Sequence, residues 1–141
     1  MELDGQCYIS GVRSPAFETL PAAYQAVAIR AFDTDWAWRR ADALQVVDAL
    51  SALRHAVASI IVWVQFPDGA RLSSFAVYQC DIEPAKSNEP WEAVVERANE
   101  AAAAYVRAFR FSDDDPASVF PPLFAICAYA ERDFRTRRFL V

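Results

Sequence analysis

The sequence predicts an α+β fold, in which a mixed or antiparallel sheet of four to five strands packs against one long amphipathic helix and two N-terminal helices. Three observations predict it: a helical apolar period over residues 88–110, two strand-like runs over 59–66 and 72–82 joined by a turn sequence, and an apolar run over 123–130. The expected order of elements is β-α-α-β-β-α-β-β. The length of 141 residues suits a single domain, residues 1–141.

The N-terminal part predicts one strand and two helices. Residues 6–12 alternate weakly between apolar and polar side chains, which predicts a short strand, placed at an edge of the sheet. Helix-start signals at Ser14-Pro15 and Thr19-Leu20-Pro21 predict a helix over 20–32. A second helix is expected from Trp36 to near His55. Its predicted buried stripe consists of Trp36, Ala43, Val46, Val47, Leu50 and Leu53.

The next two runs predict a β-hairpin. Between them lies Phe66-Pro67-Asp68-Gly69, which fits a bulged three-residue loop with glycine in the left-handed position. In the register that this loop implies, Ile61 lies opposite Phe75 and Trp63 lies opposite Ser73. The first strand of the hairpin is apolar on both faces, so we expect it to be central in the sheet.

The long helix is the clearest element of the sequence. Its apolar residues recur every three or four positions and form one face: Trp91, Val94, Val95, Ala98, Ala102, Tyr105, Val106 and Phe109. The opposite face carries Glu92, Glu96, Glu100, Arg107 and Arg110. Such a helix must bury its apolar face, and the sheet is the expected partner.

The C-terminal part predicts two further strands. Residues 112–116 hold three consecutive aspartates and a proline, as a loop does, and an apolar strand is expected over 123–130. Residues 135–141 could return as its antiparallel neighbour. Four arginines lie in or near this tail: Arg132, Arg135, Arg137 and Arg138. They could bind an anion or an acidic surface of a partner, or their charge could keep an edge strand soluble.

Composition excludes several classes of partner. The net charge of -5 and the lack of a basic stripe disfavour binding to nucleic acid. The longest nearly apolar run, residues 56–64, is too short to cross a membrane. All but one of the 14 basic residues are arginine, the exception being Lys86, which we attribute to a GC-rich bacterial genome. We therefore expect no nucleic acid and no membrane among the partners.

The cysteines indicate a reducing compartment. Cys7, Cys80 and Cys127 are odd in number and lie far apart among apolar residues, so we expect three free thiols that react slowly until the protein unfolds. Glu2 and Asp4 stand where a secretory signal would carry basic residues. Both observations favour the cytoplasm.

No set of residues indicates catalysis, a metal site or a cofactor. His55 is the only histidine, and its place at a helix end favours a capping or surface role over that of a general base. Cys80 and Cys127 lie among large apolar residues, so we interpret them as core residues and not as nucleophiles. Residues 113–115 fit a solvated loop better than a calcium site, which needs spaced oxygen ligands and a glycine. With only three glycines, the chain has no phosphate-binding loop.

The segment around Trp38 is the candidate binding surface. In a helix, Trp36 and Trp38 are about 200° apart, so one stripe cannot hold both. If Trp36 faces the core, Trp38 points outward beside Arg39 and Arg40, a composition typical of interfaces and of ligand-stacking walls. The alternative is that the first helix or the C-terminal tail covers Trp38.

These observations favour a non-catalytic binding protein, of the immunity or accessory type, that acts through a protein–protein surface toward a partner or a second copy. The alternative is a small-molecule-binding domain or an enzyme with a pocket between the sheet and the helices. Four tyrosines could line that pocket with polar groups: Tyr24, Tyr78, Tyr105 and Tyr129.

Overall fold

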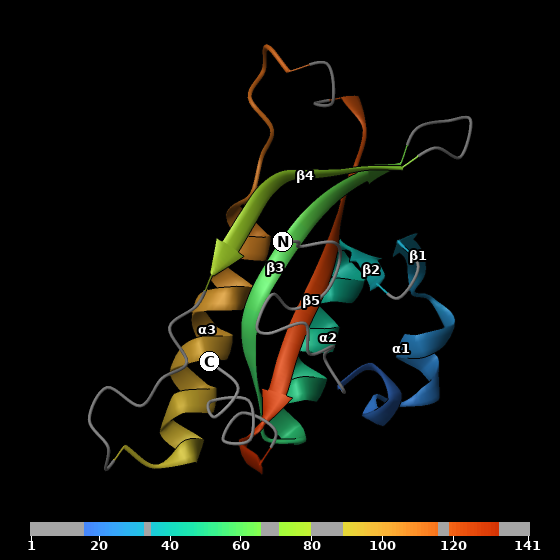
Figure 1. Ribbon diagram of the computed structural model, residues 1–141. Coiled ribbons are helices and arrows are strands. Elements are labelled where there is room, and N and C mark those ends of the chain that lie inside the picture. Colours follow the sequence, from blue (N-terminus) through green and yellow to red (C-terminus); the bar gives the residue numbers. More distant parts are fainter. Residues whose placement is uncertain (1–15, 33–34, 66–70, 80–88, 116–118, 133–141) are drawn as a thin grey trace.

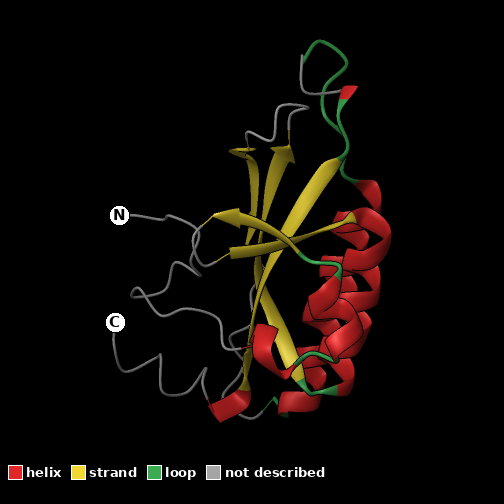
Figure 2. Cartoon of the chain, turned by 90° about the vertical axis from the view of Figure 1, so that its right-hand side faces the viewer, coloured by secondary structure: helices red, strands yellow, loops and turns green. Residues whose placement is uncertain are grey.

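The protein combines helices with an antiparallel sheet. The computed structural model describes residues 16–32, 35–65, 71–79, 89–115 and 119–132. The helical elements are the 3-10 turn η1 (Ala16–Thr19), α1 (Ala22–Ala26), α2 (Arg40–Ala52) and α3 (Trp91–Ala108). The strands are β1 (Ile29–Phe32), β2 (Asp35–Arg39), β3 (His55–Gln65), β4 (Arg71–Gln79) and β5 (Pro122–Ala130). Helices α2 and α3 lie together on one side of the sheet (Figure 1; Figure 2).

The five described strands form one sheet in the order β1-β2-β5-β3-β4, and every neighbouring pair is antiparallel. Strand β3 lies between β5 and β4, which confirms its predicted central position. The strand expected over 123–130 is confirmed as β5, which enters between β2 and β3. The strands expected over 6–12 and 135–141 lie outside the described residues.

The predicted pairing of β3 with β4 is confirmed, and its register is correct in part. Trp63 lies opposite Ser73 as expected, but Ile61 lies opposite Val77 and not Phe75. The register shifts between Val62 and Trp63, which the sequence does not signal. The turn predicted at residues 66–69 lies outside the described residues.

The long helix is confirmed as α3, and its apolar face is buried. The residues buried on it are Trp91, Val94, Val95, Ala98, Asn99, Ala102 and Val106. Its C-terminal half shares a cluster with α2 and the sheet, in which Val106 packs with Val62 and Phe124. Its N-terminal half forms a second cluster with β3 and β5, in which Trp91 packs with Tyr129. One helix therefore joins two parts of the core.

Two predictions for the N-terminal helices are wrong. The helix expected over 20–32 ends at Ala26, and β1 follows it; the second helix begins only at Arg40, because residues 35–39 form β2. The stripe of α2 is confirmed for Ala43, Val46, Val47 and Leu50. Leu53 lies beyond the helix and is 40% exposed, so it does not belong to the stripe.

The outward position predicted for Trp38 is also wrong. A strand alternates its side chains, so Trp36 and Trp38 project to the same side of β2. Both contact Phe17 of η1, whose ring centroid lies 4.9 Å from that of Trp36 and 6.0 Å from that of Trp38. Trp38 is 2% exposed, and its indole Nε1 donates to the Tyr24 carbonyl at 2.9 Å. The N-terminal elements thus cover Trp38, as the alternative prediction held.

The prediction of three free thiols is wrong for Cys127. Its side chain is buried and joined in a disulfide, whose partner lies outside the described residues. The predicted burial of Cys127 among apolar residues is confirmed, but such burial suits a disulfide as well as a thiol.

Replacement of Trp38 tests its place in the core. We expect Trp38→Ala to lower the free energy of unfolding by about 3 to 5 kcal/mol, because it removes a buried indole and its hydrogen bond. The half-buried Trp36 is the control, and Trp36→Ala should cost about half as much. Urea unfolding measures both, and a larger loss for Trp36→Ala would contradict the deeper burial of Trp38.

Thiol titration tests the disulfide. In denaturant without reductant, one of the three cysteines should react with a thiol reagent, and all three should react after reduction. Three reactive thiols in the unreduced, freshly unfolded protein would show that Cys127 is not bonded.

Candidate functional site

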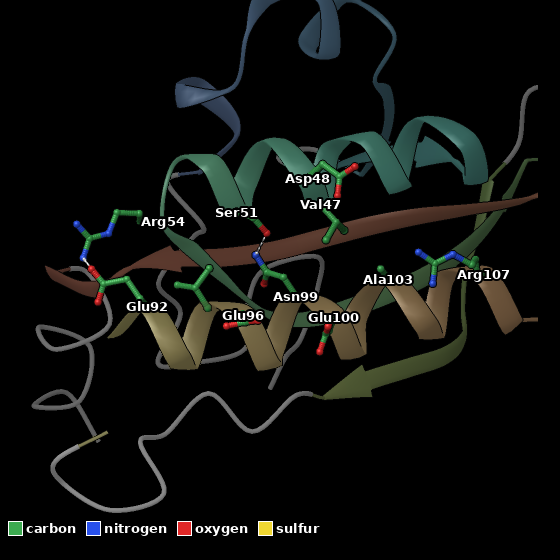
Figure 3. Close-up of a pocket in the computed structure, with 11 residues that line it drawn as sticks. Val47, Asp48, Ser51, Arg54, Glu92, Glu96, Asn99, Glu100, Ala103 and Arg107 are labelled. Carbon is green, nitrogen blue, oxygen red and sulfur yellow. Dashed lines mark hydrogen bonds and ion pairs between the residues drawn. The ribbon is translucent and has the colours of Figure 1, made fainter. Parts of the chain in front are cut away.

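Helices α2 and α3 run antiparallel and enclose a groove of about 540 Å³ (Figure 3). Contacts at both ends fix their direction: Arg40, which opens α2, reaches the last turn of α3, and Arg54, just after α2, reaches Glu92 in the first turn of α3. The groove is lined by Val47, Asp48, Ser51, Arg54, Glu92, Val95, Glu96, Asn99, Glu100, Ala103 and Arg107.

The amphipathic pattern of the two helices gives the groove its floor and its walls. Val47, Val95 and Asn99 belong to the buried faces of α2 and α3 and form the floor. The exposed residues of the lining form the walls, which consist of Asp48, Ser51 and Arg54 on one side and Glu92, Glu96, Glu100 and Arg107 on the other. The groove therefore has a mostly apolar floor between two polar walls.

Asn99 is the polar group at the centre of the floor. It is 3% exposed, and its side-chain amide makes three hydrogen bonds. Its Nδ2 donates to the Ser51 Oγ and to the His55 carbonyl, both at 2.9 Å, and its Oδ1 accepts from the Val57 amide at 2.8 Å. The sticks in Figure 3 show the bond to Ser51 reaching across the groove. Asn99 thus joins α3 to the end of α2 and to the start of β3.

The Asn99 amide substitutes for a strand at the edge of β3. The carbonyl of residue 55 and the amide of residue 57 point to the same edge of a strand, where a parallel neighbour would bond both with the N–H and the C=O of one residue. Strand β5 pairs with one edge of this stretch, but the pairing with β4 begins only at Ser59, so the described part of the chain has no strand at the other edge. Helix α3 covers the edge instead and satisfies both backbone groups.

Arg54 holds one end of the groove. Its φ of 63° is left-handed, a conformation that ends helices but is unfavourable for a residue with a Cβ. Three contacts hold it there: its amide donates to the Ser51 carbonyl at 3.0 Å, its carbonyl accepts from the Trp91 indole at 2.8 Å, and its guanidinium pairs with Glu92. The end of α2 is thereby tied to the start of α3.

Arg40 holds the other end. Its Nη1 donates to the carbonyls of Val106 and Arg107, and its guanidinium carbon lies 5.6 Å from the centre of the Phe124 ring. A cation at the C-terminus of a helix satisfies unpaired carbonyls and interacts favourably with the helix dipole. Arg40 therefore caps the C-terminus of α3.

The walls of the groove carry more negative than positive charge. They hold four carboxylates (Asp48, Glu92, Glu96 and Glu100) and two guanidinium groups (Arg54 and Arg107). Glu92 pairs with Arg54, whereas Asp48, Glu96 and Glu100 form no ion pair within the described part of the chain. Glutamates spaced by four residues repel one another and destabilise a helix by about 0.2 to 0.5 kcal/mol per pair. The excess of negative charge is thus held at a small cost in stability.

The predicted binding residues do not form one exposed surface. Trp38 is buried and Arg40 caps α3, while Arg39 is exposed at the end of β2. Trp38 consequently lacks the surface that a direct contact with a partner needs. A binding role for Arg39 stays a prediction.

None of the four predicted tyrosines lines the groove. Tyr78 and Tyr105 stack with ring centroids 4.6 Å apart, and burial raises the pKa of Tyr105. Tyr129 is fully buried in the cluster around Trp91, and Tyr24 lies in α1 beside Trp38. Tyr24, Tyr78 and Tyr105 thus pack against one core cluster, whereas Tyr129 belongs to another.

The structure changes the interpretation of His55 and adds two observations. His55 is 8% exposed and begins β3, so the predicted surface role is wrong. Among the described residues, no three His, Cys, Asp or Glu side chains gather closely enough to hold a metal ion.

Within the same ranges, no helix has the length and hydropathy that a membrane crossing requires.

The sequence also contained a signal for the groove that the prediction did not use. Asn99 interrupts the apolar face of the long helix, and a polar residue at such a position needs partners from other elements. Glu92, Glu96 and Glu100 were identified as the solvent face of the helix, but nothing in the sequence placed α2 beside them.

Comparison of the chain with models of protein families, with curated proteins and with solved structures found no match.

Replacement of Asn99 tests the network under the groove. Asn99→Leu keeps the number and branching of the side-chain heavy atoms but leaves the Val57 amide and the His55 carbonyl without this partner, so we expect a loss of about 2 to 4 kcal/mol in the free energy of unfolding. Ser51→Ala removes one bond at an exposed residue and should cost under about 1 kcal/mol. Equal losses in urea unfolding would mean that the bonds to β3 contribute nothing.

Proposed function

We propose that the protein is a non-catalytic binding protein, of the immunity or accessory type, and that its contact surface is the groove between α2 and α3. The observation that carries the proposal is that seven of the eleven lining residues are exposed, so the groove is open to solvent along its walls. A buried, partly apolar floor inside a polar rim is also the arrangement that protein interfaces use.

The length of the groove supports a polypeptide partner. Its lining residues on α3 run from Glu92 to Arg107, which at 1.5 Å per residue is about 22 Å. A helix or an extended segment can lie along two antiparallel helices over such a distance, with apolar side chains directed to the floor. Val47, Val95 and Ala103 offer apolar contacts there.

The alternative, a small-molecule-binding domain or an enzyme, finds less support in this site. Small-molecule pockets enclose about 70 to 90% of the surface of their ligand. This groove is open and lies between the two helices, not between the helices and the sheet. The tyrosines expected to line a pocket are absent from its lining.

The proposed partner is a protein or a second copy of this chain, and the acidic walls would repel the phosphates of nucleic acid. The cytoplasm stays a prediction from the sequence. Free thiols no longer support it, because Cys127 is bonded in a disulfide, a bond that is rare in reducing compartments.

Obstruction of the groove tests the proposal. Ala103 is half-buried in the lining, so Ala103→Arg should reduce capture of native partners from cells of the source by about tenfold. Ala101→Arg makes the same change at an exposed position of α3 outside the lining and should leave capture unchanged. Urea unfolding must first establish that both variants fold. Equal capture by the two variants, or no specific partner for the unmodified protein, would contradict the proposal.

A further inference from the structure

We infer that the segment bound in the α2–α3 groove is a basic amphipathic helix of a partner protein, with lysine or arginine on both sides of a narrow apolar stripe. The inference rests on the proposed function and adds the chemistry of the partner. It is drawn from the distribution of charge along the groove.

The negative charge faces the groove from both helices. Asp48 stands on the α2 wall, and Glu96 and Glu100 stand on the α3 wall, with all three exposed and unpaired within the described residues. In Figure 3 the three lie between the two arginines, on either side of Asn99. A partner with basic residues on both flanks of its apolar stripe can therefore meet carboxylates on both walls.

The two arginines of the lining are not equivalent. Arg54 is paired with Glu92, so that end of the groove is close to neutral. The side chain of Arg107 forms no ion pair within the described ranges, so the other end is positive. The partner helix should therefore carry its basic residues opposite Glu96 and Glu100 and an acidic or neutral residue opposite Arg107, which fixes its direction.

The floor sets the width of the apolar stripe. Val47, Val95 and Ala103 are its apolar members, and the Asn99 amide is already engaged in three hydrogen bonds. Small and aliphatic side chains of the partner fit such a surface. A polar group of the partner placed over Asn99 would meet a side-chain amide that is already hydrogen-bonded within the protein. Affinity should then come from the aliphatic contacts and selectivity from the charges.

Binding of a model peptide tests the inference. The probe is a helical peptide of about 15 residues, the length that spans ~22 Å, with alanine and leucine on one stripe and lysine on both flanks. We expect it to shift the backbone amide resonances of residues 95–103 in ¹⁵N NMR spectra at low salt. A peptide with glutamate in place of lysine should shift none of them.

A charge-matched pair of variants separates the groove from general attraction. Glu96→Gln with Glu100→Gln removes two charges from the wall and should weaken binding of the lysine peptide about tenfold. Asp113→Asn with Asp114→Asn removes two charges from an exposed loop outside the lining and should change binding less than about twofold.

Three outcomes would overturn the inference. Equal weakening by the two charge-matched variants would indicate non-specific attraction to an acidic protein. If the lysine and glutamate peptides bind equally, or if neither binds, the groove does not select a basic helix. Equal shifts with spermidine would indicate a site for small cations. If any of these occurs while Ala103→Arg still reduces partner capture, the inference about charge fails and the proposed function stands.

Discussion

The three hydrogen bonds of Asn99 are the constraint on which the arrangement of helices and sheet depends. The side-chain amide of Asn99 takes the position of a neighbouring strand at an edge of β3 where the described residues of β4 do not reach. Since a buried backbone group without a partner costs about 1 to 3 kcal/mol, helix α3 can approach this edge closely only with an amide at that point. The same amide bonds Ser51, so the position of α3 also sets that of α2.

Two further contacts extend this constraint along the helices. Arg40 caps the C-terminus of α3. At the N-terminus of α3, Arg54, which has a left-handed conformation, bonds the Trp91 indole and pairs with Glu92. Helices α2 and α3 are thus bonded at both ends and in the middle, and the bonds of Arg40 use carbonyls that the end of α3 leaves unsatisfied. The groove is the surface that remains between two helices held in this way, with its acidic residues facing solvent.

The N-terminal region illustrates how a local pattern can favour the wrong period. The tryptophans at 36 and 38 conflict with a helical stripe, and a helix could bury Trp36 only by turning Trp38 outward. In a strand both side chains face the same side, and Phe17 covers them. Short β-segments gain stability from neighbouring strands, so the pairing of β2 with β5, distant in sequence, decided the conformation here.

The sequence by itself determined the mixed class, the long amphipathic helix α3, the stripe of α2, and the paired strands β3 and β4, because each rests on a period of apolar residues within one segment. Tertiary structure alone decided the insertion of β5 between β2 and β3, the register shift after Val62, the burial of Trp38 and the disulfide of Cys127. It also decided the candidate site, since the groove unites Asp48 and Ser51 with Glu96 and Asn99. These residues belong to two helices separated by a hairpin, and no local period carries information about which helices become neighbours.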